Sequence, residues 1–310
     1  SFYFYFFQVN IKDTIMEQMR ERNSGRKKII QDYCDSHSWR NPLNRRDFTH
    51  IVVIEDHNIL YCSTAKVAST TWRKVLGHLE GRIGKGFKPH GKGTFRLLSQ
   101  YSNRDIKRKL ATYKKFMFVR EPFERLLSAF RDKFLSERSF RDKMVKKHSY
   151  FVKKYGTRIG RVTRALHEAS YTTAHAQNQD INVTFTDFVD YILHIGATRG
   201  RFNEHWRPYH KLCHPCQVKY DIIGHYETLV EDAEFVLREN GIDNFVTFPR
   251  REPTITSLLL LTYLKQVPLD KIRYLYSIYQ DDFEMNHYHF PGQLSSLFQN
   301  YSFAAGSLQV

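Results

Sequence analysis

Residues 51–79 have the pattern of an apolar strand that leads through a short loop into a helix. Residues 51–54 and 59–61 are apolar and are typical of extended chain, whereas small and hydroxyl residues fill 63–71. From residue 72 onward, apolar side chains recur at the spacing of one helix face: Trp72, Val75, Leu76 and Leu79. A loop that opens a helix presents unpaired backbone N–H groups and the positive end of the helix dipole. The pattern therefore predicts an anion-binding site at residues 63–71.

The side chains of this segment suit a phosphate or a sulfate. Three are cationic (Lys66, Arg73 and Lys74) and three offer hydroxyl donors (Ser69, Thr70 and Thr71). The usual loop for nucleoside triphosphates is excluded, because that motif needs two glycines and a Gly-Lys-Ser/Thr ending, and this loop contains no glycine. The alternative is an ordinary capped helix after a strand, since Ser and Thr are common at helix starts.

A second strand followed by a helix lies some fifty residues further on. Residues 116–119 are apolar, Arg120 ends the strand, and Pro122 suits the first turn of a helix. Ser128 falls about two turns into that helix. A phosphate bound between Arg120 and Ser128 would accept paired hydrogen bonds from the guanidinium and one from the hydroxyl. Arg125 either adds to this site or forms a surface pair with Glu121.

Composition and charge favour a folded protein with an acidic partner. The chain has 310 residues, of which 41% are hydrophobic, so it can bury a substantial core. Its net charge of +16 favours nucleic acid, anionic membrane or acidic glycans. No nucleic-acid-binding module is recognisable in the sequence, so we expect no nucleic-acid partner. Basic residues are dense over 131–164, which indicates either a solvated helical face or a groove for an acidic polymer.

Strands alternate with helices along the chain. A third strand is predicted at 220–223, followed by a helix over 228–240 that Gly241 ends. This order is typical of a parallel α/β sheet with its ligand at the carboxyl ends of the strands. The fold class that we predict is therefore α/β.

Three segments resemble the carbohydrate sulfotransferases of the Golgi, in particular the chondroitin/dermatan/N-acetylgalactosamine group. Residues 65–74, Ala-Lys-Val-Ala-Ser-Thr-Thr-Trp-Arg-Lys, are similar to the family's 5′-phosphosulfate loop, with Ala65, Ser69 and Thr71 in place of Pro, Cys and Asn. Residues 120–129 resemble its 3′-phosphate signature. Residues 202–232 resemble a third family block.

The resemblance implies a P-loop-like sulfotransferase fold, with a central parallel sheet flanked by helices in a single domain. It also implies 3′-phosphoadenosine 5′-phosphosulfate (PAPS) as the co-substrate that donates sulfate, with no metal. The residues that it assigns to donor binding are Ala65, Lys66, Val67, Ala68, Ser69, Thr70, Thr71, Trp72, Arg73, Arg120, Arg125 and Ser128.

Two kinds of catalytic residue are expected. Sulfuryl transfer resembles phosphoryl transfer, so positioning and charge neutralisation do most of the work. Lys66 is expected beside the bridging oxygen of the donor. For the general base we favour His90, whose segment 89–95 resembles the histidine-bearing segment of Golgi sulfotransferases that act on glycosaminoglycans. His205 is the second candidate, and Glu204 could also accept a proton.

The four cysteines suit two disulfides. We favour a local Cys213–Cys216 bridge with Cys34–Cys62 as its partner, and other pairings stay open. A zinc site at Cys213 and Cys216 is a weaker alternative, since such sites usually have a second Cys pair or a spaced His pair. A thioredoxin-like redox site is disfavoured, because no strand precedes this Cys-x-x-Cys pair.

The sequence-based division of the chain is a stem at 1–48, a sulfotransferase domain at 49–290 and a tail at 291–310. An integral first helix is the alternative to the stem. The resemblance implies the Golgi lumen and a membrane anchor that lies upstream of residue 1 or is truncated there. Sequons at Asn182 and Asn300 are compatible with that compartment. The expected activity is O-sulfation of an anionic glycan acceptor, with N-acetylgalactosamine of chondroitin or dermatan favoured. The alternatives are another glycan (a uronic acid or an N-glycan terminus) and a non-catalytic polyanion-binding protein.

Overall fold

The structure of the protein is a computed structural model with two compact units. It describes residues 2–39, 42–82, 84, 86–135, 151–166, 183–198, 200–250 and 255–298, with side chains from residue 14 onward. The first unit, here called the sheet unit, comprises Ser1–Glu121, Arg207–Pro253 and Glu284–His287. The second, here called the helical unit, comprises Pro122–Trp206, Thr254–Phe283 and Tyr288–Val310.

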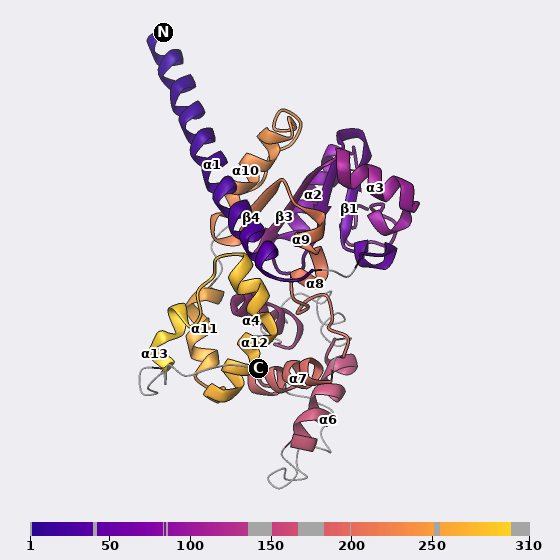
Figure 1. Ribbon diagram of the computed structural model, residues 1–310, viewed down its shortest axis with the longest axis vertical. Coiled ribbons are helices and arrows are strands. Elements are labelled where there is room, and N and C mark those ends of the chain that lie inside the picture. The colour runs from indigo at the N-terminus through magenta and orange to yellow at the C-terminus, as the bar shows by residue number, and fades with distance from the viewer. Residues whose placement is uncertain are drawn as a thin grey trace. The chain divides into compact units, whose positions relative to one another are not determined.

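The sheet unit contains a four-stranded sheet in the order β1-β2-β3-β4 (Figure 1). Its strands are β1 (Ile51–Ile54), β2 (Ile59–Cys62), β3 (Lys114–Val119) and β4 (Ile222–His225). β2, β3 and β4 run parallel, with Cys62 opposite Met117 and Val119 opposite His225. β1 forms an antiparallel edge strand, because Asn58 adopts a left-handed conformation and turns the chain back on itself. The predicted α/β class is thus confirmed.

The helices of the sheet unit follow the strands in the expected alternation. They are α1 (Phe2–Ser36), α2 (Ser69–Leu79), α3 (Asn103–Thr112), α8 (His210–Cys213), α9 (Pro215–Val218) and α10 (Leu229–Glu239). Trp72 of α2 is fully buried, and its ring centroid lies 4.8 Å from that of Phe116 and 5.2 Å from that of Phe118. This aromatic contact between α2 and β3 fixes the start of α2 against the sheet.

The helical unit has its own hydrophobic core. Its helices are α4 (Pro122–Lys133), α6 (Thr157–Leu166), α7 (Phe185–Ala197), α11 (Thr256–Leu264), α12 (Leu269–Met285) and α13 (Ser295–Phe298), the last two residues of α12 being assigned to the sheet unit. α4 begins at Pro122 as predicted, and its predicted apolar face is buried: Phe123, Leu126, Leu127 and Phe130. Fully buried Trp206 packs edge-on against Tyr155 and Phe188.

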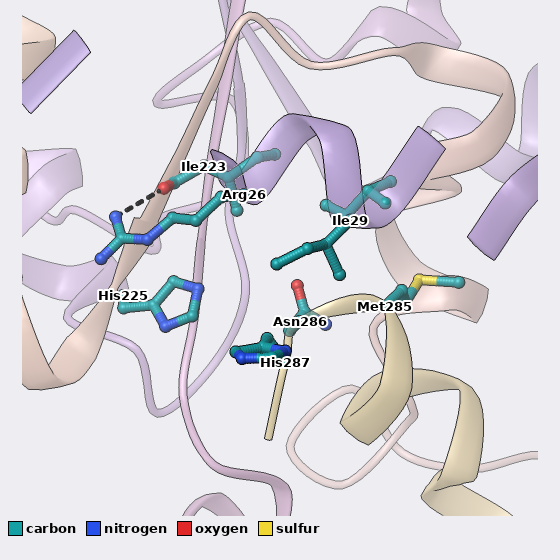
Figure 2. A pocket seen from close by; sticks show the side chains of 8 residues that line it. Arg26, Ile29, Ile223, His225, Met285, Asn286 and His287 are labelled. Atoms are coloured by element: carbon teal, nitrogen blue, oxygen red, sulfur yellow. Dashed lines mark hydrogen bonds between the residues drawn. The ribbon is translucent and has the colours of Figure 1, made fainter. Parts of the chain in front are cut away.

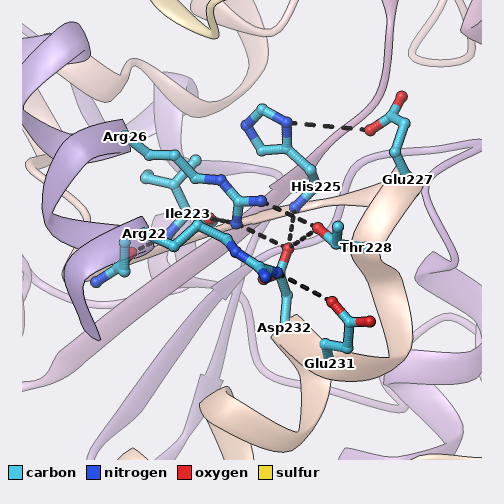
Figure 3. A network of polar contacts seen from close by, with 9 residues as sticks. Arg22, Arg26, Ile223, His225, Glu227, Thr228, Glu231 and Asp232 are labelled. Atoms are coloured by element: carbon cyan, nitrogen blue, oxygen red, sulfur yellow. Dashed lines mark hydrogen bonds and ion pairs between the residues drawn. The ribbon is translucent and has the colours of Figure 1, made fainter. Parts of the chain in front are cut away.

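The long first helix is attached to the sheet unit by a buried ion pair. Figure 1 shows α1 lying along β4 and α10, with its N-terminal turns extending past them. Arg26 of α1 donates to Asp232 of α10 at 2.7 Å, to the Ile223 carbonyl at 2.9 Å and to the Thr228 hydroxyl at 3.0 Å (Figure 3). Asp232 also accepts the N–H of His225 at 2.8 Å. These contacts favour an integral first helix over a free stem for this part of residues 1–48.

The disulfides differ from the favoured pairing. Cys34 is bonded to Cys216 and Cys62 to Cys213, so the predicted Cys213–Cys216 and Cys34–Cys62 bridges are wrong. The physical reason is the left-handed residue His214, which ends α8 and starts α9 and so sends the two cysteines to different neighbours. Since all four sulfurs are in disulfides, the zinc alternative built on Cys213 and Cys216 is also wrong.

Some predictions concern residues outside the described part of the chain. These are the two sequon asparagines, residues 136–150 of the basic run and the end of the tail at 291–310. Within the described part, none of the helices combines the length and the apolar character needed to cross a membrane.

A small hollow lies where α1 meets the end of β4. It is lined by Arg26, Ile29, Ile30, Ile223, His225, Met285, Asn286 and His287, which come from α1, β4 and the chain around the end of α12 (Figure 2). Burial lowers the pKa of His225 to about 3, and the nearby cations Arg26 and Arg22 and the ring of His287 add to this effect. His225 is therefore a neutral imidazole in the folded protein.

Replacing Arg26 by Met should cost about 3 kcal/mol of unfolding free energy, because it leaves the Asp232 carboxylate buried without its closest cation. The matched control is Lys28→Met in the same helix, which removes an exposed Lys28–Asp32 pair and should cost less than about 0.5 kcal/mol. Urea denaturation of both variants measures the difference. Equal losses would show that the buried ion pair does not hold α1 in place.

The neutral His225 should make the protein acid-sensitive. The unfolded chain takes up a proton below about pH 6.5, whereas folded His225 does not until about pH 3, so stability falls as the pH drops through this window. From pH 7 to pH 5 this residue should account for about 2 kcal/mol of lost stability. Between these two pH values, the free energy of unfolding of His225→Gln should therefore fall by about 2 kcal/mol less than that of the wild-type protein. An identical pH dependence in the variant would contradict the neutral assignment.

Candidate functional site

The loop between β2 and α2 has an unusual backbone. The N–H of Ser63 donates to the His50 carbonyl at 2.8 Å, which fixes the point where the chain leaves the sheet. Lys66 and Ala68 then have φ values of 71° and 57°. Residues other than glycine rarely adopt this left-handed conformation, and such strain is concentrated at functional sites. The loop thus turns twice within three residues without a glycine.

α2 begins without a side-chain cap. Its N-cap is Ala68, whose methyl group cannot accept a hydrogen bond, and no side chain caps the helix. The predicted alternative of an ordinary capped helix therefore does not hold. The first turn of a helix presents backbone N–H groups, and the side chain of Thr70 is exposed at this end of α2. An anion is the natural partner for such a helix start.

Arg120 lies next to this loop in the sheet. Because β2 and β3 are parallel and Cys62 lies opposite Met117, the loop after Cys62 and the residue after Val119 leave the same edge of the sheet. Arg120 is only 1% exposed, and its guanidinium lies over the ring of Tyr226 at 4.3 Å from the ring centroid. The structure therefore brings two of the predicted site elements, the loop that carries Lys66 and Arg120, to adjacent strand ends.

Arg73 connects the loop to the segment that carries His90. Its Nε donates to the Ser63 hydroxyl at 2.8 Å and its Nη1 donates to the Pro89 carbonyl at 3.1 Å. The next residue, His90, is exposed, and its Nε2 lies 2.9 Å from Oγ1 of Thr70. Arg73, which the sequence assigned to donor binding, thus also helps to position the favoured general base beside the first turn of α2.

The other predicted site residues belong to the helical unit. Arg125 is 1% exposed and its Nη2 donates to the Glu204 carbonyl at 3.1 Å, so it is a buried residue and not a surface one. Ser128 is half-buried in α4. His205 shares the Asn203 side-chain oxygen through its backbone N–H and its Nδ1, at 3.0 and 2.7 Å, and packs edge-on against Phe151.

Sequence reasoning missed two tyrosines that contact Arg120. Tyr209 hydrogen-bonds to the backbone of Arg120 and Tyr226 lies beneath its guanidinium. The only available signal was that both belong to the segment, 202–232, that resembles a family block. Nothing in the local pattern indicates a contact with a residue about ninety positions earlier.

The chemistry of the sheet-unit residues fits an anionic nucleotide. A helix start, a lysine, a buried arginine and hydroxyl groups are the donors that phosphate and sulfate oxygens prefer. No group of three or more His, Cys, Asp or Glu side chains in the described residues could hold a metal ion. The residues present therefore supply an electropositive site at the carboxyl ends of β2 and β3.

Comparison with known proteins gives a consistent result. The sequence pattern of the sulfotransferase family matches residues 49–289. Carbohydrate sulfotransferase 11 of Rattus norvegicus is 35% identical over 303 residues, which cover 93% of this chain and 80% of the relative. Carbohydrate sulfotransferase 14 of Danio rerio is 33% identical, covering 91% and 74%, and carbohydrate sulfotransferase 10 of Homo sapiens is 32% identical, covering 86% and 75%. The comparison with solved structures gave no significant match.

The matched region contains the loop with Lys66, the strand end with Arg120 and the segment with Tyr209 and Tyr226. The chain therefore belongs to the sulfotransferase family, among its carbohydrate sulfotransferases, and is an enzyme that uses PAPS as its sulfate donor.

Proposed function

We propose that this enzyme transfers sulfate from PAPS to a hydroxyl of N-acetylgalactosamine in chondroitin or dermatan. The observation that carries the donor half of the proposal is the departure of the Lys66 loop and of Arg120 from adjacent parallel strands. The acceptor half is supported by the names of the relatives, which are carbohydrate sulfotransferases, by the resemblance of residues 65–74 to the chondroitin group and by a net charge of +16.

Contacts of the sheet unit support the proposed donor site. The 5′-phosphosulfate would bind the loop from Ala65 to Trp72 and the start of α2, with Lys66 neutralising the charge on the leaving phosphate. Arg120 would hold the 3′-phosphate through its buried guanidinium. The resemblance of residues 120–129 to the family signature also supports Arg125 and Ser128 as donor-binding residues.

The reaction needs a base for the acceptor hydroxyl. The sugar oxygen attacks sulfur, the bond between sulfur and the phosphate oxygen breaks, and 3′-phosphoadenosine 5′-phosphate leaves. We assign the hydroxyl proton to His90, because its ring contacts Thr70 in the first turn of α2, where the sulfate would bind. His205 remains the second candidate, and its hydrogen bonds to Asn203 favour a packing role.

The setting of the reaction is also part of the proposal. Two disulfides suit an oxidising secretory compartment, and we propose the Golgi lumen as the location of this enzyme. We further propose that the reaction uses no metal and that the polyanionic partner is a glycan and not nucleic acid. The sulfotransferase domain is proposed to span 49–290, and the segments before and after it to support it.

Labelled PAPS should transfer its label to desulfated chondroitin or dermatan, and digestion to disaccharides should locate it on N-acetylgalactosamine. Uronic-acid acceptors and N-glycans in the same panel test the alternative acceptors. Label found only on one of these would contradict the proposed acceptor and leave the donor site intact. Steeply salt-dependent glycan binding without transfer would support a pure polyanion binder instead.

Lys66→Ala should lower turnover in this assay by at least about 100-fold, because it removes a charge that would stabilise the transition state. Lys107→Ala removes an exposed charge from α3 of the same unit and should retain nearly full activity. Equal activities of the two variants would contradict the role of Lys66.

His90→Ala should lower kcat by about 100-fold or more and remove the rise of the rate with pH that a general base produces. The measurement is a pH–rate profile at saturating PAPS, with His205→Ala as the matched histidine variant. An unchanged rate and profile in His90→Ala, with both altered in His205→Ala, would transfer the role of base to His205.

A further inference from the structure

The hydroxyl of Tyr209 hydrogen-bonds to both backbone groups of Arg120. This residue lies one position beyond β3, where the ladder of the strand ends. Its N–H donates to the Tyr209 hydroxyl at 2.9 Å, and that hydroxyl donates to the Arg120 carbonyl at 3.1 Å. Both residues are buried, so these hydrogen bonds satisfy backbone groups that water cannot reach.

The same region fixes the direction of the Arg120 side chain. The guanidinium lies over the ring of Tyr226, which follows directly after β4. The next backbone N–H, that of Glu121, donates to Oε1 of Glu227 at 3.0 Å. Backbone and side chain of Arg120 are therefore held from two separate segments, one ending in Tyr209 and the other beginning at Tyr226.

The segment that contains Tyr209 is also tied to the Lys66 loop. The Tyr209 carbonyl accepts the N–H of Cys213 at 2.8 Å, which makes one rigid turn of the chain between them. Cys213 is bonded to Cys62, the last residue of β2, and its sulfur lies 3.3 Å from the Thr64 hydroxyl in the loop. One short segment thus joins the two strand ends at which the donor site is built.

We propose that Tyr209 is a positioning residue for donor binding, and that its hydroxyl sets the place of the Arg120 guanidinium relative to the Lys66 loop. The inference rests on the proposed function, in which Arg120 holds the 3′-phosphate of PAPS. Without the hydroxyl, the backbone of Arg120 loses two buried hydrogen bonds and the strand end can shift. A shift of about 1 Å is enough to weaken a charged contact to a phosphate.

The test measures preference for the 3′-phosphate, using 3′-phosphoadenosine 5′-phosphate and adenosine 5′-phosphate, which lacks it. Tyr209→Phe should weaken binding of the first nucleotide by about 10-fold and leave binding of the second within about 2-fold, as expected for loss of one charged contact. Isothermal calorimetry on the oxidised protein gives both dissociation constants. A merely structural role would weaken both nucleotides alike.

Tyr220→Phe is the matched control. Tyr220 is also buried, and its hydroxyl donates to the Cys213 carbonyl at 2.8 Å, so the same atom is lost from the same part of the fold. This variant should keep the wild-type preference. Loss of the preference in both variants to the same extent would overturn the assignment to Tyr209.

A second pair of changes covers the case in which Tyr209→Phe does not fold. The double variant Cys62→Ala, Cys213→Ala releases the segment from β2 and keeps the phenol. It should lose the same preference for the 3′-phosphate, and a wild-type preference in it would overturn the inference. The proposed function fails separately: wild-type protein that binds both nucleotides equally would overturn the 3′-phosphate site and this inference with it.

Discussion

The parallel, in-register pairing of β2 with β3 determines where the proposed donor site can form. It brings the loop after Cys62 and the buried Arg120 to the same edge of the sheet, although 57 positions separate Cys62 from Val119 along the chain. The pairing of β3 with β4 then adds Tyr226 beneath the guanidinium. A nucleotide with phosphates at both ends of its ribose requires donors at two such neighbouring points.

The loop itself depends on contacts that hold a costly backbone in place. Two left-handed residues without glycine cost of order 1–3 kcal/mol each and persist only where the surroundings fix them. Burial of Trp72 fixes the helix after the loop, and the Cys62–Cys213 bridge fixes the strand before it. A loop held in this way would lower the ordering cost of binding an anion.

Local pattern predicted the local parts of the structure. The strand, loop and helix over 51–79 and the start of α4 at Pro122 follow from periodicity and helix-start chemistry, which act over a few residues. The disulfide partners could not be predicted, since Cys62 and Cys213 are 151 residues apart and spacing carries no information about such contacts.

The same limit explains what was missed at the site. Arg125 was equally compatible with a surface pair or a site role, and only tertiary packing makes it buried. The hydrogen bonds between Tyr209 and Arg120 join residues that are 89 positions apart. They depend on the position of α8, which the Cys62–Cys213 disulfide helps to fix. The family motifs identified PAPS as the ligand, whereas only the structure identifies the residues that hold Arg120.

If two strand ends hold opposite ends of one nucleotide, its binding should change the hydrogen–deuterium exchange of both. Addition of 3′-phosphoadenosine 5′-phosphate should slow exchange in peptides covering both 63–72 and 118–122, because the nucleotide orders both segments. Adenosine 5′-phosphate should protect only the first. Protection of neither segment, or of segments elsewhere in the chain, by the doubly phosphorylated nucleotide would contradict the account.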